Sequence, residues 1–192
     1  CEMTGLNAEV DCLVEIAVVV TNSELEILGE GIDIVIKPTA EGLANMGEFV
    51  TNMHTESGLI NEFENGLELA DAEQIVLEYV KRFVPEARTA PLAGNTIGTD
   101  RLFITKYMPK VDAHLHYRSI DVSSIKELSR RWYPRVYFQM PKKDGGHRAL
   151  ADILESIREL RYYRETVFVE LPGPSSAEAQ LAAEKVSEDN SN

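Results

Sequence analysis

The sequence predicts an α/β fold in which a mixed sheet is flanked by helices. Leu13–Thr21 and residues 28–36 are rich in Val and Ile and flank a polar turn at residues 22–24, which is the pattern of a hairpin of two buried strands. Two shorter strand candidates, residues 89–93 and 119–122, are each followed closely by a segment that favours a helix. Strands alternating with helices in this way are typical of an α/β protein.

Four helices are expected, at residues 71–83, 100–107, 123–132 and from near 147 to about 166. The first carries apolar residues at helical spacing. Thr99 or Asp100 is the candidate N-cap of the second helix, and Ser123 is the candidate N-cap of the third. We expect Trp132, at the end of the third helix, to pack in the core.

Length and composition indicate one globular domain. The 192 residues, of which 44% are hydrophobic and 27% charged, suffice for a buried core. We assign residues 1–171 to this domain, and the polar residues 172–192 to a frayed helix and a disordered tail. No apolar run approaches the ~20 residues of a membrane span. We therefore expect a cytoplasmic protein without membrane association, in which Cys1 and Cys12 are reduced, structural thiols.

Three short segments carry acidic residues suited to one metal site. They are CEMTGL at residues 1–6, GNTIGTD ending at Asp100, and GGHRALAD ending at Asp152. Glu2, Asp100 and Asp152 in these segments carry carboxylates, which are the ligands that hard divalent cations prefer. His147 and Asp152 are five residues apart, about 500° on a helix, and share a site only if His147 precedes the helix. Two glycines before His147 supply the backbone freedom for such a loop.

Five blocks of the chain, in their order and spacing, resemble the oligoribonuclease branch of the DEDDh exonuclease superfamily. They are EMTGL (2–6), MHTESGL (53–59), PLAGNTIGTDRLFITKYMP (91–109), HYRSIDVSSIKELSRRWYP (116–134) and HRALADILESIRELRYYRE (147–165). The resemblance implies an RNase H-like, exonuclease-type fold, a 3′-to-5′ exonuclease that uses two divalent ions, Mg²⁺ or Mn²⁺, and a homodimer. The first motif of that superfamily is Asp-x-Glu, and its Asp would fall one residue before Cys1. We therefore expect the first central strand, which ends at this Asp, to be missing from Cys1–Asn192 and the fragment to be nearly inactive.

The resemblance also implies roles at the reacting centre. Glu2, Asp100 and Asp152 would hold the metal ions, and the Asp before Cys1 would bridge them. His147 would take the proton of the attacking water, since its unperturbed pKa lies near ~6.5.

Substrate contacts follow from the same matched blocks. They would come from Met3, Thr4, Leu6, Phe49, His54, Thr96, Arg118 and Ser123, with Tyr117 reaching in from the partner subunit. Leu6 and Phe49 would sandwich bases. Thr96, Arg118 and Ser123 would bind the 5′ end of the substrate.

Three functions stay open at this point. The blocks favour a 3′-to-5′ exoribonuclease that degrades di- to pentanucleotides of single-stranded RNA to 5′-mononucleotides. The alternatives are a DEDDh exonuclease on DNA or longer RNA, and a non-catalytic nucleic-acid-binding or scaffold protein that truly lacks the first Asp. The net charge of −13 disfavours long duplex DNA, which requires a basic groove, but a short oligomer presents few phosphates.

Some positions have an ordinary alternative. Phe49 could equally be a core residue, and His54 could pack rather than contact substrate. His114 and His116 have a metal-like His-x-His spacing, but the superfamily uses neither as a ligand. Solvated helix surface is expected for Lys126, Arg130, Arg131, Glu155 and Glu159.

Overall fold

The strands of the protein form two separate sheets. The computed structural model describes residues 1–142 and 148–189. One sheet is antiparallel in the order β1 (Glu2–Met3), β2 (Leu13–Thr21), β3 (Ile27–Val35); the other pairs β4 (Pro91–Gly94) with β5 (His116–Asp121) in parallel. The predicted α/β class with parallel and antiparallel pairing is confirmed, and the β2–β3 hairpin lies within one residue of its predicted bounds.

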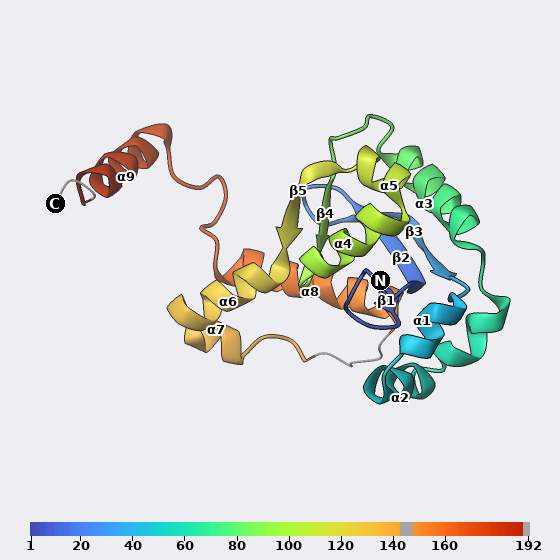
Figure 1. Ribbon diagram of the computed structural model, residues 1–192. Helices are drawn as coiled ribbons and strands as arrows, with labels where there is room; N and C mark the ends of the chain where they lie inside the picture. Colours follow the sequence, from blue (N-terminus) through green and yellow to red (C-terminus); the bar gives the residue numbers. More distant parts are fainter. Residues whose placement is uncertain (143–147, 190–192) are drawn as a thin grey trace.

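Helices cover these strands and fill the connections between them (Figure 1). They are α1 (Ala40–Asn45), α2 (Glu48–Glu56), the 3₁₀ helix η1 (Leu59–Asn65), α3 (Leu69–Phe83), α4 (Ile97–Tyr107), α5 (Pro109–His114), α6 (Val122–Trp132), α7 (Pro134–Phe138), α8 (Ala149–Thr166) and α9 (Ser176–Asp189). All four predicted helices form, but their predicted N-caps are wrong. Thr96 is the N-cap of α4. Asp121 is the N-cap of α6, and its side chain accepts a hydrogen bond from Ser123 N at 2.9 Å.

The main core lies between the antiparallel sheet and the helices α3, α4 and α5. Ile16 of β2, Val76 of α3 and Phe103 of α4 are fully buried members of one apolar cluster. Adjacent residues of a strand point to opposite faces, so Glu15 points away from this cluster. On that side α8 contacts β2, β3 and β4 (Figure 1). Helix α8 therefore spans both sheets.

Two predictions about burial are wrong. Trp132 is 66% exposed rather than in the core, because it lies at the end of α6 beyond the contact of that helix with α8. Glu155 and Glu159 are buried rather than solvated, because α8 packs against β4 and α6. The Glu159 carboxylate lies 3.6 Å from Lys126 Nζ and accepts a hydrogen bond from Asn95 at 3.3 Å. Lys126 is consequently a partner of a buried acid and not simply solvated surface.

The C-terminal segment stands apart from the body of the protein. Helix α9 is exposed along its length and lies away from the sheets (Figure 1). The division into a domain of residues 1–171 and a disordered tail stays a prediction, although residues 176–189 form a helix here. Within residues 1–142 and 148–189, none of the helices has the length and apolar character needed to cross a membrane. Both cysteines are free thiols, as predicted.

Candidate active site

Three acidic residues come together from three elements. Glu2 lies on the short strand β1, Asp100 in the first turn of α4, and Asp152 in the first turn of α8. Burial raises the pKa of Glu2 to about 7; the chain's amino group opposes this rise, and the carboxylates of Asp152, Glu15 and Asp100 add to it. The predicted carboxylates therefore lie in one electrostatic field. A buried acid among like charges is stabilised by a cation.

Asp100 lies next to the start of β1. The backbone nitrogen of Cys1 is 2.8 Å from Asp100 Oδ1, so α4 and the residues before β1 are in direct contact. The oxygen donors of Glu2, Asp100 and Asp152 fit a hard divalent cation by their chemistry. As they stand, however, no three Asp, Glu, His or Cys side chains within the described part of the chain are grouped closely enough to hold an ion.

Two residues expected to contact substrate, His54 and Thr4, are buried and hydrogen-bonded next to β1. His54 is fully buried on α2, and its Nε2 donates a hydrogen bond to the Met3 carbonyl at 2.9 Å. Since the carbonyl can only accept, Nε2 is the donor in this hydrogen bond. Thr4 Oγ1 is also buried, and it accepts a hydrogen bond from Cys12 N at 3.0 Å. The geometry favours packing over substrate contact for both side chains.

Two apolar side chains next to these residues are open to solvent. Leu6, in the loop after β1, is 77% exposed, and Phe49, on α2, is 80% exposed. The hydrogen bond between His54 and Met3 ties α2, which carries Phe49, to β1, which the loop bearing Leu6 follows. Phe49 is not a core residue. Exposed flat or apolar side chains of this kind are suited to stacking on nucleobases.

Two hydroxyls meet at the start of α4. Thr96 has a left-handed backbone with φ 53°, and its N–H donates to Asp121 Oδ1 at 3.0 Å and to Ser123 Oγ at 2.9 Å. Thr96 Oγ1 and Ser123 Oγ are 3.1 Å apart. Thr96, the N-cap of α4, and Asp100, in its first turn, are four residues apart in the chain, which corresponds to about 6 Å of rise along a helix axis.

The remaining members of the predicted site lie on β5 or outside the described residues. Tyr117 and Arg118 are exposed on β5, and the Arg118 guanidinium lies over the Tyr117 ring at 5.4 Å from its centroid. His147, the expected proton acceptor, lies outside the described residues. His114 and His116 both hydrogen-bond to backbone groups, His114 to the Val84 carbonyl and His116 from Arg118 N.

Comparisons with known proteins address the same set of residues. A family model described as exonuclease matches residues 1–160. The chain is 64% identical to the oligoribonuclease of Leifsonia xyli, covering 98% of this chain and 91% of that protein. It is 59% identical to the oligoribonuclease of Streptomyces coelicolor, covering 96% and 92%. The chain belongs to the oligoribonuclease family.

The solved structures support the fold alone. An exonuclease I from Methylocaldum szegediense matches with a TM-score of 0.58 and 18% identity, over 86% of this chain and 39% of that one. Membership of the exonuclease family also implies dependence on divalent metal ions.

Sequence reasoning missed the residues that hold this site together. Asp121 accepts hydrogen bonds from both Thr96 N and Ser123 N, and so joins α4 to α6. Glu15 and Arg148 join β2 to α8. A signal for Glu15 was present, because a single acid inside an apolar, Val/Ile-rich strand must have a partner. Nothing in the sequence identified that partner as Arg148.

Proposed function

We propose that this protein hydrolyses short RNA oligomers with the residues described above. Membership of the oligoribonuclease family makes it a 3′-to-5′ exoribonuclease that degrades short oligoribonucleotides. The observation that carries the assignment of residues is the short separation, on α4, of Asp100 from the hydroxyls at Thr96 and Ser123. The two ends of a very short substrate would contact these two places.

The acidic cluster is proposed to hold two divalent ions, Mg²⁺ or Mn²⁺. Glu2, Asp100 and Asp152 are the ligands in this proposal, with a further Asp before Cys1. When bound, such ions lower the pKa of water and stabilise the leaving 3′ oxygen. His147 is proposed to accept the proton that the attacking water loses.

The exposed side chains supply substrate binding in this proposal. Leu6 and Phe49 stack on the bases near the 3′ end, and the backbone of Met3 and Thr4 faces the same nucleotide. Thr96, Ser123 and Arg118 bind the phosphate at the 5′ end, through two hydroxyls and one guanidinium. In a longer RNA, further nucleotides would occupy the place where these three residues bind the terminal 5′ phosphate. The proposal therefore favours di- to pentanucleotides over long RNA.

A homodimer is proposed to complete the 5′ subsite. Apolar side chains are exposed along β5, α6 and α7, namely Tyr117, Ile120, Leu128, Trp132, Tyr133 and Phe138. Strand β5 pairs only with β4 within the described residues, so its outer edge is available. Exposed apolar patches of this kind are typical of protein–protein contacts. In the dimer, Tyr117 would reach the partner's substrate. The cytoplasmic location stays a prediction.

The function is tested with 5′-labelled oligomers and Mn²⁺. The expected result is stepwise shortening of an RNA pentamer from its 3′ end down to the labelled mononucleotide. A 24-residue RNA and a DNA pentamer should react slower by at least one order of magnitude. Faster hydrolysis of DNA or long RNA would favour the second function considered above. No hydrolysis of any RNA by a chain that also carries the Asp before Cys1 would favour a non-catalytic relative.

A further inference from the structure

A single ionic network joins the start of α8 to β2 and η1. Arg148 Nε donates a hydrogen bond to Glu15 Oε1 at 2.7 Å, and Arg148 Nη1 donates one to Glu62 Oε1 on η1 at 2.8 Å. The second oxygen of Glu15 accepts a hydrogen bond from Ala149 N at 2.7 Å. Glu15 is 0% exposed, so both oxygens of a completely buried carboxylate bind α8.

Glu15 acts as the N-cap that α8 lacks. The side chain of Arg148, at the N-cap position, makes no capping hydrogen bond, and the carboxylate that binds the first N–H of the helix comes from β2 instead. A carboxylate at a helix N-terminus is stabilised by the helix dipole and by the free N–H groups there. Removing one partner from such a buried pair is costly, because the other charge is left uncompensated. The start of α8 is therefore fixed tightly to the sheet.

The fixed turn is the one that carries Asp152. Asp152 N donates to the Arg148 carbonyl at 3.1 Å, which closes the first turn of α8. On the other side, Glu15 is the register partner of Glu2 in the β1–β2 ladder. Glu15 of β2 thus lies beside Glu2 and also holds the turn of α8 that carries Asp152. Any shift of this turn changes the separation of the Glu2 and Asp152 carboxylates.

We propose that Glu15 and Arg148 are positioning residues that set Asp152 at the separation from Glu2 and Asp100 that a divalent cation needs. This inference rests on the proposed function, which assigns those three acids to metal. Glu15 and Arg148 are not among the metal ligands or substrate contacts of that function, and their partners named above are protein groups. Residues that orient metal ligands in this way contribute through geometry, and their loss typically costs 10–100-fold in metal affinity or activity.

Two variants test the inference against a matched control. Arg148→Lys keeps the positive charge but cannot form the planar fork that reaches Glu15 and Glu62 together. Glu15→Gln keeps a cap for Ala149 N but presents an amide N–H₂ or a weaker acceptor to Arg148.

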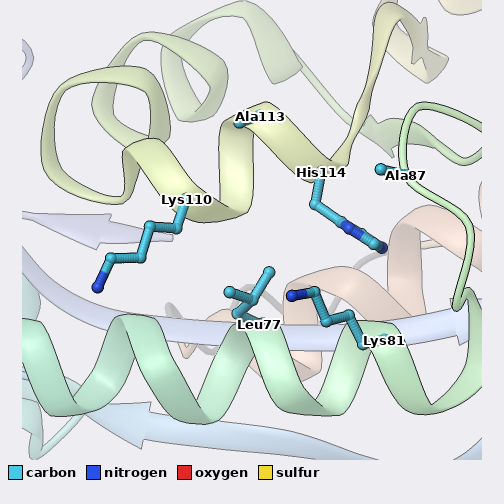
Figure 2. Close-up of a pocket in the computed structure, with 6 residues that line it drawn as sticks. All are labelled: Leu77, Lys81, Ala87, Lys110, Ala113 and His114. Carbon is cyan, nitrogen blue, oxygen red and sulfur yellow. The ribbon is translucent and has the colours of Figure 1, made fainter.

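The control is Glu73→Gln, which alters a similar contact away from the acidic cluster. Glu73 on α3 is also buried, and its carboxylate accepts a hydrogen bond from Lys110 N, at the start of α5, at 2.7 Å. Lys110 lies beside the surface hollow between α3 and α5 that His114 and Lys81 also line (Figure 2).

The readouts are the melting temperature in EDTA, the Mn²⁺ concentration at half-maximal stabilisation, and kcat and KM on an RNA dinucleotide. All three variants should melt at a lower temperature than the wild type in EDTA. Only Arg148→Lys and Glu15→Gln should raise the Mn²⁺ midpoint by about tenfold or more and lower kcat similarly, with KM nearly unchanged.

The outcomes separate the inference from the function. If Arg148→Lys folds and leaves the Mn²⁺ midpoint and kcat unchanged, the inference is overturned. This holds even if Glu15→Gln fails to fold. A midpoint shift of equal size in Glu73→Gln also overturns it, since the effect would then be general loss of stability. A parent chain that carries the Asp before Cys1, responds to Mn²⁺ and still cleaves no RNA overturns the proposed function, and the midpoints still decide the positioning role.

Discussion

At the scale of single residues, Asp100 and Asp152 each place a negative charge near Glu2 of β1, and each lies in the first turn of a helix. Both raise the pKa of Glu2, so both lie within electrostatic reach of it. Replacing either by Asn removes a metal ligand while keeping the side-chain volume. We expect Asp100→Asn and Asp152→Asn to lower RNA hydrolysis by at least two orders of magnitude and to leave the melting temperature in EDTA the same or higher. Undiminished hydrolysis in either variant, or in excess EDTA, contradicts the metal assignment.

Glu2 makes the metal-free protein sensitive to pH. Its pKa rises from 4.5 to about 7 in the folded chain, chiefly through burial, so the folded state holds this proton more tightly than the unfolded state. The free energy of unfolding therefore falls as pH rises from about 4.5 to about 7, by of the order of 3 kcal/mol for this group. Melting in EDTA at pH 5 and pH 7.5 measures the fall. Glu2→Gln should show a clearly smaller fall, and Mn²⁺ should offset it in the wild type; equal falls in both proteins contradict the prediction.

At the scale of an element, the start of α4 carries parts of two proposed subsites. Thr96, at its N-cap, belongs to the 5′-phosphate subsite, and Asp100, in its first turn, belongs to the acidic cluster. Ser123→Ala removes one of the two hydroxyls proposed to bind the 5′ phosphate. We expect KM for an RNA dinucleotide to rise about tenfold, since a hydrogen bond to a charged group contributes roughly 1.5–3 kcal/mol. The loss on a pentanucleotide should be smaller, because its additional nucleotides supply other contacts. Ser124→Ala, at the exposed neighbour on α6, is the control and should leave both KM values unchanged.

Long elements were predictable from the sequence, and short ones were not. The strand Leu13–Thr21 and the helix Leu69–Phe83 follow from apolar periodicity, which depends only on the chain itself. Helices α1, α5 and α7 have five or six residues and form because their neighbours pack on them, since isolated helices of that length are unstable. The carboxylates of the site were predictable as motifs. Their supports were not, because Glu15 and Arg148 are 133 residues apart.

At the scale of the whole molecule, the proposed dimer places one residue of each chain in the other chain's site. Tyr117 is 74% exposed on β5, where its ring stacks on His116. We expect Tyr117→Ala and Asp100→Asn chains to be weak separately and to recover part of the activity when mixed. One site of the mixed dimer then combines an intact acid cluster with an intact Tyr117. Sedimentation establishes the dimer. Full activity in a monomer contradicts the proposal, as does a mixture with no gain.

Strands β2 and β4 belong to separate sheets, and each has an edge with few or no strand partners among the described residues. Within the described residues, β2 has a β1 partner only opposite Leu13 and Glu15, and β4 pairs only with β5. Cys1 lies beside Asp100 of α4, so a strand added before Cys1 would start next to this helix, and we expect it to pair with β2 and β4. An apolar strand there would bond the free edges of both sheets, which otherwise expose unpaired backbone groups.

Two extensions separate the strand from its acid. One is an apolar strand ending in Asp directly before Cys1, and the other is the same strand ending in Asn. Both should raise the melting temperature in EDTA over that of Cys1–Asn192, because both complete the hydrogen-bond ladder. Only the strand ending in Asp should strengthen the response to Mn²⁺ and raise dinucleotide hydrolysis by orders of magnitude, because only it adds a ligand that bridges two ions. If Cys1–Asn192 melts at the same temperature as the extended chains and cleaves as fast, the sheet needs no such strand and the acid cluster no such ligand.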